Sequence, residues 1–291
     1  MTRILFRGLL GLLLAAVCLA STSFSATQDK AALPASDEAA LRVVVEQFYA
    51  AQEKKDVAAL LKLWSERSPQ YGEFKQSLER QQAGAQTGRY ASPAVLRPRV
   101  VGEGVELRTS VEFTGAAAGA ETERQVRDFV MMKEGGEWKV WKYDAPAKKL
   151  AADLAKVENE AERTALLAEG RELETPELVR EMNDQGRFLG NQGKRDRALA
   201  VLQAAQEMAE RIGSRREVSR ALLNIGSVYY SQGSYAKALE YYQKSHVLAE
   251  QLGYNAGKAR SLHNIGVIYR MQSNYAKALE YYQKSLRFMK N

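Results

Sequence analysis

Apolar residues in the C-terminal part of the chain recur with the period of an α-helix, in paired stripes separated by a short polar break. In the clearest unit, the first stripe consists of Val218, Leu222, Ile225 and Tyr229. Gly233 is expected to supply the turn and Ser234 to cap the next helix. The second stripe consists of Ala238, Leu239, Tyr242, Leu248 and Leu252, with Gly253 as its C-cap. The pattern predicts two antiparallel helices in each unit.

This helical pair recurs at an offset of 40 residues. The segment 234–245, SYAKALEYYQKS, is almost identical to the segment 274–285, NYAKALEYYQKS. A weaker copy lies upstream, so we expect three units, at 176–213, 214–253 and 254–291. A repeat of this period is typical of a solenoid, in which stacked units form an extended binding surface.

The residues that precede the repeats follow a different pattern. A first helix is predicted at 36–54, capped by Ser36, and a second at 56–64, capped by Asp56. Within 95–144 the apolar period changes to two, which predicts strands at 105–113, 126–132 and 138–143. Helices followed by antiparallel strands indicate an α+β domain over 36–146.

A charged segment with one apolar stripe connects this domain to the repeats. Residues 147–175 are predicted to form a single rigid helix that packs against the first repeat as its cap. Thr175 and Pro176 then restart the helical pattern, with Thr175 as N-cap and Pro176 in the first turn.

The N-terminus has the features of a secretory signal peptide. Two arginines precede the uncharged apolar run 8–20, and small residues follow it, which predicts a cleaved signal over 1–26. The run is shorter than the ~20 residues of a transmembrane helix. A lipoprotein anchor on Cys18 is disfavoured, because Val17 stands where that motif requires a small residue. We therefore expect a periplasmic or secreted protein that holds no cysteine after cleavage, which excludes disulfides and thiol chemistry.

The net charge of +7 is unevenly distributed. From Arg171 onward, Lys and Arg outnumber Asp and Glu by 19 to 12, whereas the earlier residues balance at 23 to 23. Two interpretations stay open: a solvated basic face, or a groove for an acidic or carboxylate-bearing ligand. Export disfavours nucleic acid as the partner.

Motifs for catalysis, cofactors and metals are not found. The sequence holds no Gly-rich phosphate loop, no His-Glu-x-x-His and no Gly-x-Ser-x-Gly, and both histidines, His246 and His263, lie in the repeats. We therefore expect no catalytic residue, no cofactor and no metal site. Core packing is favoured over a small apolar pocket for the aromatic residues of the α+β domain, namely Trp64, Phe113, Phe129, Trp138 and Trp141.

Both parts of the chain resemble known families. Small and aromatic residues at the spacing of a tetratricopeptide repeat (TPR) are Gly226, Tyr229, Gly233, Tyr235, Ala238 and Tyr242. The 40-residue period resembles the long-helix variety found in several adaptor proteins. The order of elements over 36–146 resembles the NTF2-like (SnoaL-like) superfamily, a cone of curved sheet wrapped by N-terminal helices. The segments that carry this second resemblance are 48–50, 56–64 and 136–141.

The TPR resemblance implies that the first helix of each repeat lines a concave face. One slot of that helix holds Arg180, Arg220 and Arg260, and the slot four residues later holds Asp184, Asn224 and Asn264. A spacing of four places both slots on one face. Arginine can fork onto carboxylates, and the resemblance implies that the asparagines pair with a peptide backbone. The predicted peptide-binding residues are therefore Arg180, Arg220, Asn224, Arg260 and Asn264. The alternative is that they are ordinary exposed residues preserved by duplication.

Several functions compete on this sequence. The favoured one is a non-enzymatic exported scaffold that binds a protein or peptide in the groove. The alternatives are a small-molecule-binding or enzymatic NTF2-like domain with TPRs as an oligomerisation or regulatory module, or the N-terminal part of a longer bacterial signalling protein. No capping helix follows the last repeat, so self-association is expected through its apolar residues Tyr275, Leu279, Tyr282, Leu286 and Met289.

Overall fold

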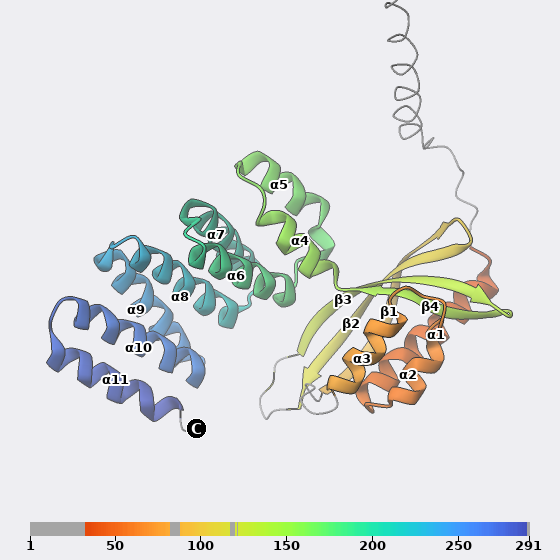
Figure 1. The fold of residues 1–291 in the computed structure, drawn as a ribbon, viewed down its shortest axis with the longest axis horizontal. Coiled ribbons are helices and arrows are strands. Elements are labelled where there is room, and N and C mark those ends of the chain that lie inside the picture. The colour runs from red at the N-terminus through yellow and green to blue at the C-terminus, as the bar shows by residue number, and fades with distance from the viewer. Residues whose placement is uncertain (1–32, 82–87, 117–119, 121, 290–291) are drawn as a thin grey trace, which may run out of the picture.

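The computed structural model describes residues 33–81, 88–116, 120 and 122–289, so the expected signal peptide and Cys18 lie outside the described residues. The chain folds as an α+β domain followed by a run of paired helices, as expected (Figure 1). The first domain has a four-stranded antiparallel sheet in the order β1-β2-β3-β4, with helices packed on one face. Its elements are α1 (Ala35–Glu53), α2 (Val57–Leu63), α3 (Tyr71–Gln81), β1 (Gly88–Val101), β2 (Gly104–Gly115), β3 (Thr122–Glu134) and β4 (Glu137–Asp144).

Aromatic side chains form the centre of this domain. Phe48 of α1 and Phe129 of β3 meet edge to face, with ring centroids 5.2 Å apart, and Trp64 stacks on Phe74 at 4.2 Å. Of the aromatic residues expected in the core, all are buried except Trp141, which is half-buried. Alternation along β2 and β3 places Phe113 and Phe129 on the face that the helices cover, so the helices and the sheet enclose one core.

The helix starts and ends in this domain differ partly from the expectations. Asp56 caps α2 as expected, since its carboxylate accepts from the Ala59 amide at 2.9 Å. The prediction for Ser36 was wrong: α1 already begins at Ala35, and its N-cap position is Pro34, which makes no side-chain cap. Trp64 lies just beyond α2 in extended conformation, because it forms a parallel bridge with Val140.

Six helices make up the array: α6 (Pro176–Asn191), α7 (Arg195–Arg211), α8 (Arg215–Ser231), α9 (Tyr235–Gln251), α10 (Asn255–Met271) and α11 (Tyr275–Met289). The glycines between them adopt positive φ as expected, 75° at Gly233 and 62° at Gly253. Gly226 is needed for close packing, since a Cβ there would lie 2.7 Å from the Tyr242 ring. Ser234 occupies the N-cap position of α9 but its side chain makes no capping bond.

The connector is not the single helix expected over 147–175. It consists of α4 (Pro146–Leu154), α5 (Glu160–Glu169) and a short 3-10 turn at Arg171–Leu173. Asn159 starts α5 by accepting from the Glu162 amide at 2.7 Å, and such a cap favours a new helix over continuation of the old one. The expected packing on the first repeat is present: α4 contributes buried residues to the same apolar cluster as α6. The N-cap at Thr175 is also confirmed, by a 3.2 Å bond from the Leu178 amide.

Within the described ranges, none of the helices combines the length and apolar character needed to cross a membrane.

Candidate peptide-binding groove

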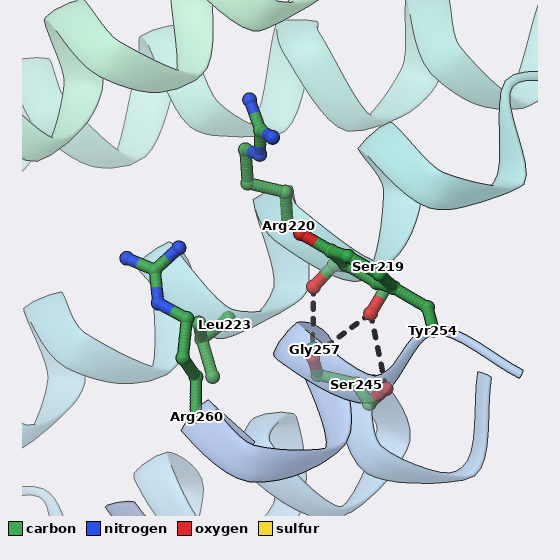
Figure 2. A pocket seen from close by; sticks show the side chains of 7 residues that line it. All are labelled: Ser219, Arg220, Leu223, Ser245, Tyr254, Gly257 and Arg260. Carbon is green, nitrogen blue, oxygen red and sulfur yellow. Dashed lines mark hydrogen bonds between the residues drawn. The ribbon is translucent and has the colours of Figure 1, made fainter. Parts of the chain in front are cut away.

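The three arginines of the repeated slot lie on the first helices of successive units. Arg180 belongs to α6, Arg220 to α8 and Arg260 to α10, and each of these helices packs against the next. Arg220 and Arg260 line one small pocket together with Leu223 and Tyr254. Figure 2 shows both guanidinium groups on the side of this pocket that is turned away from Ser245. Two of the predicted residues therefore share one site.

Serines form the base of this pocket and hold two helices close together. Ser245 of α9 donates to the Ser219 carbonyl at 2.8 Å, and Ser219 of α8 donates to the Ser245 carbonyl at 3.1 Å (Figure 2). Both side chains are buried. This reciprocal pair satisfies the two serine hydroxyl groups internally and fixes α8 on α9, so the arginines are the charged groups of the pocket.

The first slot is already paired within the chain. Both carboxylate oxygens of Glu123, on β3, accept from the Arg180 Nη2 at 2.7 Å. The Arg180 Nε also lies 3.6 Å from a carboxylate oxygen of Glu217. Arg180 therefore joins the sheet of the first domain to the array, and its guanidinium group is not free for a peptide.

In the second slot, the positive charge of Arg220 is partly compensated by Glu217, which lies one turn earlier on α8. This carboxylate is 3 % exposed and lies 3.5 Å from Arg220 Nη1. Burial raises the pKa of Glu217, and the neighbouring Arg220 and Arg180 oppose that rise. Within the described part of the chain, neither Glu217 Oε2 nor Arg220 Nε has a hydrogen-bond partner. Nε is buried, but the Arg220 side chain is 22 % exposed and its Nη2 makes no hydrogen bond or ion pair with the described residues, so Arg220 keeps donor capacity for a ligand.

The third slot is open. Arg260 is exposed and makes no ion pair or hydrogen bond with any residue that the structure describes. The three arginines are therefore unequal, with Arg180 paired, Arg220 loosely held and Arg260 available. The repeated sequence does not show this difference.

The two asparagines that were expected to pair with a peptide backbone are not equivalent. Asn224 is 6 % exposed and donates to the Asn183 carbonyl at 3.2 Å, so its side chain links α8 to α6. Asn264 is half-buried and makes no side-chain hydrogen bond to the described residues. Asp184, in the first unit, is exposed and pairs with Arg187 at 3.1 Å. Of the three residues in this slot, only Asn264 makes no hydrogen bond or ion pair with a residue that the structure describes.

Two residues of this site were missed in the sequence. Glu217 stands three positions before Arg220, a spacing that places both on one helix face, and this signal could have identified it. Glu123 could not have been identified in the same way, because it comes from a strand of the other domain.

The interior of the α+β domain holds one charged group near its junction with the array. Arg127 of β3 donates to Tyr143 Oη at 3.1 Å and to Glu177 of α6 at 2.6 Å. Burial raises the pKa of Tyr143, and Arg127 opposes that rise. Burial likewise raises the pKa of Tyr90 to about 12. Because an arginine stays protonated, Arg127 itself does not act as a general base.

A wider cleft lies between the sheet and the connector helices. Its charged residues are largely paired with one another, as Arg108 is with Asp128 at 2.6 Å and Lys142 with Asp144 at 2.5 Å. Arg108 also contacts Glu172 of the connector. These pairs explain how the cleft is held together, while three further charged residues that line it, Lys148, Lys149 and Glu169, make no ion pair with the described residues.

Comparison with known proteins supports the assignment of the helical array. The family model of the tetratricopeptide repeat matches residues 179–251 and 217–291, so the C-terminal part of this chain contains TPR repeats. No curated protein matches the sequence.

Three solved structures align with part of the chain at low identity. The TPR domain of Arabidopsis FLU is 17 % identical, with 38 % of this chain and 94 % of that chain covered and a TM-score of 0.36. BtubC from P. vanneervenii is 19 % identical, with 50 % and 57 % covered and a TM-score of 0.40. A Nostoc punctiforme protein of unknown function with a cystatin-like fold is 10 % identical, with 38 % and 90 % covered and a TM-score of 0.32.

Proposed function

We propose that this protein is an exported scaffold that binds an acidic segment of a partner protein or peptide in the groove of its TPR array. The presence of TPR repeats supports a role in protein–protein interaction. The features of residues 1–26 support export to the periplasm or outside the cell, and the 40-residue spacing of the helices supports the long-repeat variety. The order of elements in the first domain supports an NTF2-like cone.

The pocket shared by Arg220 and Arg260 is the observation that carries this proposal. Two guanidinium groups on one side of a pocket, one of them without any partner among the described residues, favour a ligand that brings carboxylates. Asn264, one turn after Arg260, adds a donor and an acceptor for the peptide backbone.

Replacing both groove arginines tests the proposal. In the Arg220→Gln/Arg260→Gln variant, we expect affinity for an end-blocked hexaglutamate peptide to fall at least tenfold, because each charge-assisted hydrogen bond contributes about 1.5–3 kcal/mol. Calorimetric titration measures this change. The matched control is Arg270→Gln/Arg287→Gln, which removes the same charge from two exposed positions outside the pocket. An equal loss in both variants would show that only net charge matters and would reject the groove.

We propose further that a second copy of the chain packs on α11. Four large apolar side chains on this helix are each more than half exposed, namely Tyr275, Leu279, Leu286 and Met289. On α9, the helix of the preceding unit, the equivalent Tyr235 and Leu239 are half-buried, because α10 packs against them. An uncovered apolar face of this kind favours association.

The Leu279→Glu/Leu286→Glu variant is expected to be monomeric at concentrations where the unchanged protein self-associates. The physical reason is that charge on the apolar face must be desolvated in the contact. Sedimentation velocity over a concentration series measures the association. Val43→Glu/Val247→Glu, at two other exposed apolar positions, serves as the control and should associate like the unchanged protein. An unchanged protein that stays monomeric throughout the series would contradict the proposal.

The second candidate function is that the α+β domain binds a small molecule or catalyses a reaction on it. We favour the scaffold because aromatic rings occupy the centre of this domain and Arg127, whose side chain is 12 % exposed, is a group that stays protonated. The possibility that the chain is the N-terminal part of a longer signalling protein is compatible with both functions.

We expect the protein to have no hydrolase, transferase or redox activity of its own. General acid–base catalysis requires a titratable group near the operating pH in a pocket, and the sequence of the α+β domain offers no histidine for that role. A broad substrate screen on the purified protein checks this expectation. Turnover that disappears in the Arg127→Gln variant would contradict it, provided that this variant remains folded.

A further inference from the structure

The ion pair between Glu123 and Arg180 has the geometry of a bound ligand. Arg180 occupies the same slot of its repeat as Arg220 and Arg260, and the carboxylate of Glu123 approaches it from outside the array. Glu123 lies at the start of β3, in an extended segment that belongs to the other domain. At Arg180, a carboxylate on an extended backbone is therefore already bound. The proposed partner would supply the same kind of group to Arg220 and Arg260.

The docking of β3 onto α6 does not depend on this pair alone. Val126 is buried in the apolar cluster of the array, and Arg127 pairs with Glu177 at 2.6 Å. In one of the two ion pairs the acid, Glu123, lies on β3, and in the other the acid, Glu177, lies on α6. Each element therefore supplies one acidic and one basic side chain. The strand is thus held in place by neighbours of Glu123, so removal of the Glu123 charge should leave the junction formed.

We propose that Glu123 acts as a built-in ligand of the first arginine slot and so confines an acidic partner to Arg220 and Arg260. This inference rests on the proposed function of the groove. A tethered carboxylate has an effective concentration of about millimolar or more, so it outcompetes a dilute peptide for Arg180. Glu123 is therefore a specificity-determining residue, which sets how many acidic side chains a partner can place in the groove.

Removal of this internal ligand should create a third binding position. In the full-length Glu123→Gln variant, we expect affinity for end-blocked hexaglutamate to rise about fivefold to tenfold, because Arg180 keeps only its 3.6 Å contact with Glu217 and its Nη2 becomes available for one further charge-assisted bond. Calorimetric titration at fixed salt measures this rise. The gain should vanish in Glu123→Gln/Arg180→Gln, which removes the newly exposed guanidinium group.

The matched control is Glu112→Gln. Glu112 is exposed on β2, carries the same charge and makes no ion pair with the described residues. It therefore reports the effect of net charge on peptide affinity without exposing Arg180. Thermal unfolding of each variant shows whether the junction is intact.

The outcomes separate this inference from the function on which it rests. The inference is supported if affinity for hexaglutamate rises more in Glu123→Gln than in Glu112→Gln and if this rise requires Arg180. Equal affinities of the two single variants, with binding still lost in Arg220→Gln/Arg260→Gln, overturn the inference and leave the groove function standing. Absence of binding in every variant overturns both.

Discussion

Replacing Phe129 by alanine is expected to lower the free energy of unfolding of the α+β domain by about 3–5 kcal/mol. The Phe129 side chain is 1 % exposed, and its ring lies 5.2 Å from Phe48 and 5.0 Å from Tyr143. The substitution removes apolar burial and leaves a cavity that the surrounding rings cannot fill without losing their own contacts.

Tryptophan fluorescence in a urea titration measures this loss selectively, because all three tryptophans lie in the α+β domain. Phe188→Ala is the matched control: it makes the same change on α6, where the ring is 57 % exposed, and should shift stability by no more than about 0.5 kcal/mol. Comparable losses in the two variants would show that Phe129 does not lie in a close-packed core.

The Glu177→Gln variant is expected to lose about 3–5 kcal/mol of stability at the junction between the domains. Its partner Arg127 has a side chain only 12 % exposed, and Glu177 Oε2 lies 2.6 Å from Arg127 Nη1. Removal of the carboxylate leaves a buried guanidinium group with neutral partners, chiefly Tyr143 and Gln125. The loss of stability is therefore caused by an uncompensated charge, and it is larger than the net stabilisation that the ion pair provides.

A double-mutant cycle separates these two quantities. Glu177→Gln/Arg127→Met removes the charge together with its partner and should recover much of the loss. Asp184→Asn is the control on the same helix, since its pair with Arg187 is half exposed on both sides and should contribute at most about 1 kcal/mol. Urea unfolding followed by fluorescence and by circular dichroism measures each of these proteins. If the double variant is no more stable than Glu177→Gln, the uncompensated charge is not the cause of the loss.

The sequence pattern and the fold disagree at β1 and at the start of α1, and in both places the reason lies in the residues of that segment. The first strand that the pattern predicts is 105–113, so the pattern misses β1, Gly88–Val101. This strand contains two prolines and two register irregularities. An edge strand tolerates both features, and they obscure its alternation. Ser36 is a good capping residue by type, but the chain starts its helix one residue earlier.

The connector differs from its prediction for a related reason. Its apolar stripe continues through the break at 155–159, so the pattern predicts one helix where the chain forms two. Periodicity alone does not reveal such a break when the apolar residues before it and after it pack against the same apolar cluster.

The sequence by itself determined the elements that depend on local pattern. Helical period, positive-φ glycines such as Gly233, and small residues such as Gly226 were sufficient to define the paired helices of the array. Alternation was sufficient to place β2, β3 and β4, because one face of each strand must be buried. The arginine slot was also visible, because a 40-residue repeat keeps equivalent positions in register.

Only the tertiary structure decided which of these arginines are available. Arg180, Arg220 and Arg260 are equivalent in the repeat, but Glu123 reaches Arg180 from a strand 57 residues earlier in the chain. Asn224 was expected to face a peptide, yet the packing of α8 on α6 buries it against the Asn183 carbonyl. A repeated sequence specifies the helix face on which a side chain lies. The groups that approach that face from other domains are set by long-range packing, and those groups decide which charges remain unpaired.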